Sequence, residues 1–127
     1  MTGLTQTEAA VLAARHVAAF NDAVGAGNFS DFLTLFTDAA VIRFENVPGA
    51  GDLEYRGRDI YTRAYDEQPP DDEIDIAGSA TCDGSTVLVP FKWRRDGSAG
   101  TLGLTYTGER GDDLDGRQVS GMTVVFT

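Results

Sequence analysis

Residues 5–41 read TQTEAAVLAARHVAAFNDAVGAGNFSDFLTLFTDAAV, and this stretch determines how the fold begins. Thr5 and Glu8 match a capping box, in which a hydroxyl and a carboxylate each bind an otherwise unpaired backbone amide. A helix is therefore predicted over residues 6–24, with Gly25 and Gly27 ending it. Spacings of three and four residues place one set of side chains on the buried face of this helix: Leu12, His16, Ala19, Phe20 and Ala23.

Further along, the chain alternates between short helices and turns. Asn28 can cap a second, short helix that runs to Phe36, and Asp38 is expected in a turn. A strand is predicted over residues 41–46, followed by a loop that contains a proline and two glycines. A third helix is predicted from Arg58 to Glu67, because two prolines follow it and apolar side chains recur at helical spacing.

The remaining chain has the pattern of antiparallel strands. Period-two alternation predicts strands at residues 74–81, 86–94, 101–107 and 118–126, and Asp83-Gly84 indicates a hairpin turn. In the third of these, Leu102, Leu104 and Tyr106 share a face. Early helices and late strands predict one α+β domain over residues 1–127, with helices on one face of a strongly curved sheet. Such a sheet leaves a concave space suited to a ligand.

Composition narrows the class of partner. The net charge is −10 and the sequence pI about 4.3, so nucleic acid and anionic membrane surfaces are excluded as partners. One cysteine and one histidine, without clustered ligands, predict no metal site, and no motif implies a cofactor. A lone cysteine and the lack of a visible signal peptide or apolar span favour the cytoplasm.

Four segments carry a family resemblance. They are Arg15–Asn21 (RHVAAFN), Gly27–Phe29 (GNF), Leu35–Val41 (LFTDAAV) and Tyr55–Ile60 (YRGRDI). Together they resemble the first half of ketosteroid isomerase-like and SnoaL-like proteins of the nuclear transport factor 2-like superfamily. The resemblance implies a cone-shaped, cystatin-like fold. In that fold three N-terminal helices pack on a strongly curved, mostly antiparallel sheet that encloses a pocket.

The resemblance also assigns positions, and several depart from the pattern. The family's first-helix tyrosine falls on His16, its supporting tyrosine on Tyr65 and its carboxylate base on Phe44. Its protonated aspartic acid falls near Leu104 or Thr105. Because the usual aspartates are missing, two hypotheses about function stay open. One is an isomerase or polyketide cyclase that transfers protons on an apolar polycyclic ligand. The other is a noncatalytic binding or dimeric interaction domain of the same fold.

His16 and Tyr65 are accordingly the catalytic candidates. The ligand-binding candidates are aromatic: Phe20, Phe44, Tyr61, Trp93 and Tyr106. Each of these side chains has an ordinary core role as its alternative. His16 is predicted to be buried, neutral at pH 7 and hydrogen-bonded to Tyr65. Glu45 and Asp59 are weaker acid–base candidates, the first expected to pair with Arg43 or Lys92 and the second to cap the third helix.

A homodimer is predicted from the open face of the sheet. That face would be too apolar to remain in water, because it is expected to carry Leu88, Leu102, Leu104 and either Val124 or Val125.

Overall fold

The computed structural model describes residues 5–47, 49, 51–57, 72–95, 97–107 and 118–126. Within these ranges two helices precede and cover a mixed seven-stranded sheet. The helices are α1 (Gln6–Ala26) and α2 (Ser30–Leu33). The strands are β1 (Phe36–Val47), β2 (Gly51–Arg56), β3 (Ile74–Ile76), β4 (Thr81–Asp83), β5 (Thr86–Trp93), β6 (Ala99–Tyr106) and β7 (Val119–Phe126).

The capping box at the start of α1 is confirmed. The Glu8 amide donates to the Thr5 hydroxyl at 3.1 Å, and the Thr5 amide donates to the Glu8 carboxylate at 2.9 Å. The helix ends at Gly27, whose φ of 67° lies in the left-handed region that glycine adopts without steric cost. Because Gly25 is still helical, α1 extends two residues beyond the predicted end.

The second helix is shorter than predicted. It ends at Leu33, and its N-cap is Phe29, whose side chain makes no capping hydrogen bond, so the predicted cap at Asn28 is wrong. The Asn28 side chain instead accepts a hydrogen bond from the Ser30 amide at 2.9 Å, in the turn that precedes the helix. β1 begins at Phe36, so Asp38 lies in a strand and the predicted turn at this residue is wrong. The third predicted helix, over residues 58–67, falls outside the described residues.

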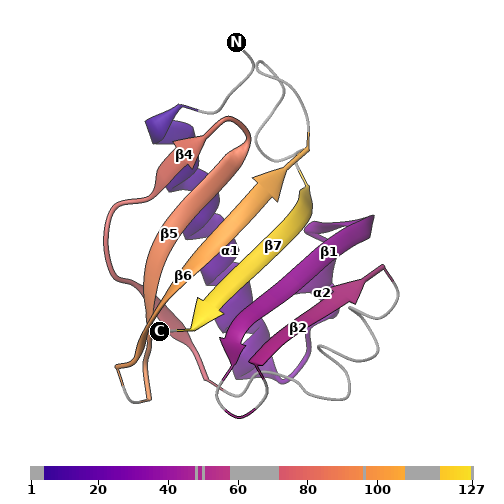
Figure 1. The fold of residues 1–127 in the computed structure, drawn as a ribbon, viewed down its shortest axis with the longest axis vertical. Helices are drawn as coiled ribbons and strands as arrows, with labels where there is room; N and C mark the ends of the chain where they lie inside the picture. Colours follow the sequence, from indigo (N-terminus) through magenta and orange to yellow (C-terminus); the bar gives the residue numbers. More distant parts are fainter. Residues whose placement is uncertain are drawn as a thin grey trace.

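The sheet has the strand order β2-β1-β7-β6-β5-β3, and β4 pairs with β5 beside β3. β1 and β7 are parallel, and the other paired strands are antiparallel. Figure 1 shows a broad twisted layer with α1 crossing one face. The strongly curled cone that the resemblance implied is not seen in this part of the chain.

Two strand predictions need correction. β2 was predicted as part of a loop, but it pairs with β1 from Val41↔Arg56 to Val47↔Gly51. The single strand predicted over residues 74–81 is instead two strands, β3 and β4. The break lies opposite Pro90, which has no amide to donate, and there the Ala77 amide donates to the Pro90 carbonyl at 2.8 Å.

The core lies between the helices and the inner face of the sheet. Alternate residues of β5 and β6 point into it, and Val87, Val89, Leu102 and Leu104 are almost fully buried. This placement corrects the dimer argument, because Leu102, Leu104 and Val124 are buried on the inner face of the sheet and do not lie on the open face. Neither described helix is long and apolar enough to cross a membrane.

Candidate ligand pocket

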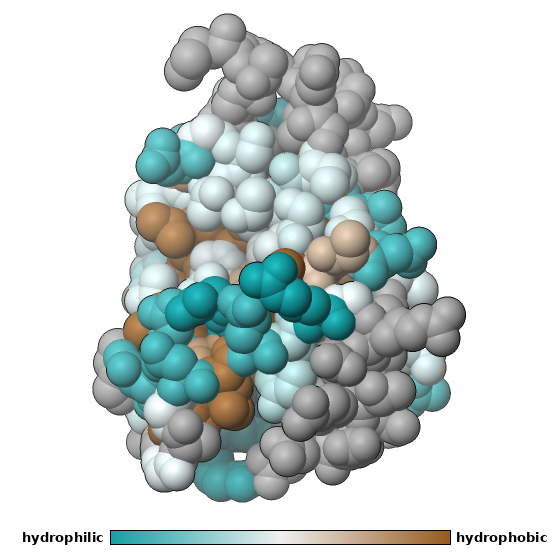
Figure 2. All heavy atoms as spheres, turned by 45° about the vertical axis from the view of Figure 1, so that its right-hand side comes forward, coloured by the Kyte–Doolittle hydropathy of each residue, from teal (hydrophilic) through white to brown (hydrophobic). Residues whose placement is uncertain are grey.

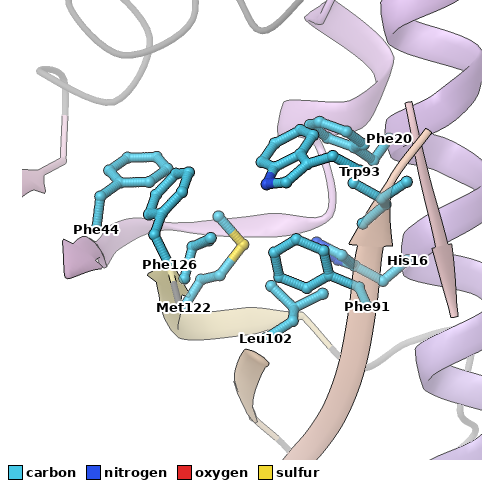
Figure 3. A pocket seen from close by; sticks show the side chains of 10 residues that line it. His16, Phe20, Phe44, Phe91, Trp93, Leu102, Met122 and Phe126 are labelled. Carbon is cyan, nitrogen blue, oxygen red and sulfur yellow. The ribbon is translucent and has the colours of Figure 1, made fainter. Parts of the chain in front are cut away.

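An apolar pocket lies between α1 and the inner face of the sheet (Figure 3). Its volume, taken as the room for the centre of a water-sized sphere, is about 50 Å³. The lining side chains come from α1 and from strands β1, β3, β5, β6 and β7: His16, Phe20, Phe44, Ile74, Phe91, Trp93, Leu102, Met122, Val124 and Phe126. His16, Phe20, Phe44 and Trp93 were predicted site residues, and the structure brings these four together.

The pocket has a closed end and a more open end. His16, Phe91 and Leu102 are at most 3% exposed and form the closed end. At the other end Phe44 and Phe126 lie side by side, and both are half-buried (Figure 3). The rings of Trp93 and Phe126 are nearly parallel, with centroids 6.0 Å apart. A ligand entering between these half-buried rings would therefore reach the His16 end last.

His16 is held by aromatic neighbours on one side. Its ring makes edge contacts with Phe32 at a centroid distance of 5.1 Å and with Phe36 at 5.8 Å. Burial, helped by the nearby charge of Arg15, lowers the pKa of His16 from 6.5 to about 3. The lowered pKa agrees with the predicted neutral imidazole.

The predicted hydrogen bond between His16 and Tyr65 involves a residue outside the described part of the chain and stays a prediction. His16 Nδ1 is buried, and none of the described residues forms a hydrogen bond with it. An unpaired buried polar atom of this kind costs about 1–3 kcal/mol, so a ligand that satisfied it would recover part of that energy.

The other candidates lie elsewhere. Tyr106 is buried away from the pocket, where its hydroxyl donates to the Leu12 carbonyl at 3.4 Å and burial raises its pKa to about 12. Glu45 pairs with Arg43 on the open face at 3.4 Å, as predicted for a non-functional carboxylate. Tyr61 and Asp59 fall outside the described residues, as Tyr65 does.

The chemistry available in the pocket is limited. Among its described lining residues, His16 is the only ionisable group. The indole nitrogen of Trp93 faces the space beside Met122, which adds one hydrogen-bond donor (Figure 3). No group of three His, Cys, Asp or Glu side chains could hold a metal ion in the part of the chain that the structure describes.

Six lining residues were not among the predicted site residues, although Leu102 and Val124 had been assigned to the open face: Ile74, Phe91, Leu102, Met122, Val124 and Phe126. Their alternation within each strand was visible, since Phe91 and Trp93 share a face, as do Leu102 and Leu104. Alternation shows which side chains lie together but not which face the helix covers. The missing information was the side of the sheet on which α1 packs.

Two local features shape the pocket wall. The Asn21 side chain donates to the Ile74 carbonyl and accepts from the Ile74 amide, both at 2.9 Å, and so ties α1 to β3. Gly100 leaves room for the Phe91 ring, because a Cβ atom there would lie 2.4 Å from Phe91 Cζ. The first contact holds the backbone of Ile74 and the second positions the Phe91 ring, and both residues line the pocket.

A family model for the SnoaL-like domain matches residues 17–125, which is most of the chain. The chain therefore belongs to the SnoaL-like domain family. Among curated proteins, none matches it in sequence.

Similar solved structures agree on the fold. A SnoaL-like protein of unknown function from Burkholderia thailandensis is 16% identical, with a TM-score of 0.62 and 98% of each chain covered. An NTF2-like protein from Anabaena variabilis is 14% identical, with a TM-score of 0.62, covering 100% of this chain and 94% of that one. A protein provisionally described as a ketosteroid isomerase, from Kribbella flavida, is 21% identical, with a TM-score of 0.54 and 95% and 78% covered. These similarities establish an NTF2-like α+β fold.

Proposed function

We propose that this SnoaL-like domain binds a small apolar molecule in the pocket without transforming it. The observation that carries the proposal is the composition of the wall. Apolar side chains surround one neutral imidazole, and no described lining residue supplies a second ionisable group. A concave apolar site with one or two polar groups is the usual form of a small-molecule site.

The state of His16 argues against proton transfer. An efficient general acid or base has a pKa near the working pH. With a pKa of about 3, the protonated form of His16 is scarce at pH 7 and the neutral ring is a weak base. Binding therefore explains the geometry better than catalysis.

The size of the pocket limits the ligand. Sites for larger molecules occupy roughly 300–1,000 Å³. The present room of about 50 Å³ is far below that, and a polycyclic molecule would need large displacements of the wall. We therefore narrow the expected ligand from a polycyclic molecule to a smaller one.

Isomerase or cyclase chemistry is the second candidate. The unpaired Nδ1 of His16 favours it, because a proton-transfer group needs an unoccupied nitrogen. Tyr65 would then have to act with His16 inside the pocket. If the domain is an isomerase or cyclase, replacing Tyr65 with Phe would lower the turnover of its substrate. If the domain only binds, the same replacement would leave the affinity for the ligand nearly unchanged.

A fluorescence titration tests the binding proposal. Trp93 is the only tryptophan of the chain and lines the pocket, so toluene should change its emission saturably. Leu102→Phe should fill the closed end and weaken binding at least tenfold. Val11→Phe adds the same ring at a position that is 49% exposed, and it should bind like the parent. A parent protein that shows no saturable change with any apolar compound would refute the proposal.

We further propose a homodimer formed through the open face of the sheet. β6 and β7 carry no charged side chain, although the chain has a net charge of −10. Figure 2 shows pale, weakly polar residues over the upper part of the face in view, with separate hydrophobic patches and a strongly hydrophilic band across the middle. A shallow hollow of about 240 Å³ crosses it above Gly103 and Gly121, and Leu88, which is 42% exposed, stands at its side.

In a two-fold symmetric pair, Leu88 of each copy could enter the hollow of the other. Leu88→Glu should then convert a dimer to a monomer in sedimentation at micromolar concentration. A monomeric parent protein would contradict the proposal. The cytoplasm remains the proposed compartment, on the evidence of the lone Cys82.

A further inference from the structure

We propose that the ligand is a neutral, single-ring aromatic molecule bearing one hydroxyl, and that this hydroxyl binds the imidazole of His16. The inference rests on the proposed function, since it names the class of molecule that the same pocket would take. Three properties of the pocket lead to it: the shape of its walls, the lack of charge, and the state of the His16 nitrogens.

The walls favour a flat molecule. Phe20, Phe44, Phe91, Trp93 and Phe126 present ring faces and edges to the space. Aromatic rings gain energy from stacked and edge-to-face contacts beyond the burial of their surface. The room of about 50 Å³ is below the roughly 150 Å³ of a cavity that holds benzene, so a single ring would have to displace the half-buried rings at the open end. A fused second ring would force the wall further apart.

The absence of charge favours a neutral molecule. No described lining residue carries a charge at pH 7, because the pKa of His16 is about 3. An ionised ligand would lose its hydration without gaining a partner of opposite charge. The net charge of −10 would in addition repel an anion on approach.

The His16 imidazole favours a hydroxyl. A neutral imidazole has one nitrogen that donates and one that accepts, and here Nδ1 is buried without a hydrogen-bond partner among the residues that the structure describes. A half-turn of the ring about its Cβ–Cγ bond exchanges nitrogen and carbon positions, so either nitrogen can face the ligand. A hydroxyl both donates and accepts, so it can bind whichever nitrogen is presented. A carbonyl could only accept, and a methyl group could do neither.

The closed end strengthens this contact. His16 is 3% exposed, and its neighbours Phe91 and Leu102 exclude water from it. Because water is excluded from the imidazole before the ligand enters, the hydrogen bond from the ligand hydroxyl to His16 displaces no hydrogen bond between His16 and water. The new hydrogen bond should therefore offset the desolvation of the hydroxyl and also increase the affinity.

The test compares four compounds by titration at pH 7: phenol, toluene, benzoate and 2-naphthol. Phenol is neutral at this pH, as the tyrosine side chain is. Phenol should bind at least tenfold more tightly than toluene, benzoate should not bind measurably, and 2-naphthol should bind more weakly than phenol. Phenol affinity should also be equal at pH 6 and pH 8, because His16 stays neutral across that range.

Two variants assign the preference to His16. His16→Phe should bind phenol and toluene equally, whereas His16→Gln, which keeps a donor and an acceptor, should retain part of the preference for phenol. Equal affinity of the parent protein for phenol and toluene would overturn this inference and leave the binding proposal intact. Tighter binding of benzoate or 2-naphthol than of phenol would overturn it as well. No binding of any of the four would refute the proposed function together with the inference.

Discussion

Replacing His16 with phenylalanine should stabilise the protein, and should do so more strongly in acid. The ring contacts with Phe32 and Phe36 can persist in the variant, and the pocket beside residue 16 can accept the slightly larger ring. The variant removes a buried nitrogen to which no described residue forms a hydrogen bond. At pH 8 we expect the free energy of unfolding to rise by about 1–2 kcal/mol, within the range for an unpaired buried polar group.

The pH dependence follows from the depressed pKa of His16. Between pH 6.5 and about 3 the unfolded chain takes up a proton at this residue and the folded protein does not. The stability of the parent protein is therefore fully present above pH 6.5 and is lost as the pH falls, by up to about 1.4 kcal/mol per pH unit. At pH 5 the advantage of His16→Phe should have grown by about 2 kcal/mol over its value at pH 8.

Urea unfolding at pH 5 and pH 8, followed by Trp93 fluorescence and far-ultraviolet circular dichroism, measures this difference. Tyr106→Phe is the matched control, because Tyr106 is also buried but has a pKa of about 12 and does not titrate in this range. Its effect on stability should be the same at both pH values. An advantage of His16→Phe that is equal at pH 5 and pH 8 would refute the argument that burial suppresses protonation of His16.

Three further predictions concern the frame of the pocket. Gly100→Ala should lower the free energy of unfolding by about 1–3 kcal/mol and weaken toluene binding, because the new methyl group would overlap the Phe91 ring. An unchanged free energy of unfolding in urea would contradict this clash. Asn21→Ala should cost about 1–3 kcal/mol and speed hydrogen exchange of the Ile74 amide, whereas unchanged exchange would show that the tie to β3 is dispensable. Thr5→Ala should lower stability by about 1 kcal/mol in thermal melts through loss of the helix cap, and an unchanged melt would exclude that role.

Much of the fold was predictable because its signals are local. The capping box and the glycine at position 27 mark α1, and a hairpin joins β4 to β5 at Gly84, whose φ is 61°. β2 was missed because Gly49 and Gly51 indicate a loop, while its hydrogen bonds come from pairing with β1. A strand that depends on a distant partner leaves little trace in its own sequence.

The pocket was only partly predictable. His16 stands out because a lone histidine on an apolar helix face needs an explanation. Phe44 and Trp93, which were chosen from the resemblance and from strand alternation, line the same pocket as His16. Tyr106 has the same alternation but packs beneath Leu12. The residue types alone do not show this difference, because it depends on where along the sheet α1 crosses. The missing partner of His16 Nδ1 likewise depends on three-dimensional packing.

The position of β7 has a consequence for how the protein folds. β7 comes last among the strands in sequence, yet it lies between β1 and β6 in the middle of the sheet. Its parallel pairing joins residues such as Ile42 and Met122, which are far apart in the chain. Bringing β1 and β7 together closes a long loop, and the entropy lost in doing so is offset only after the strands have paired. Topologies of this kind fold slowly. During synthesis, β1 and β2 must therefore remain separated from β6 and β5 until β7 has emerged, and the pocket, which uses Met122, Val124 and Phe126, forms only then.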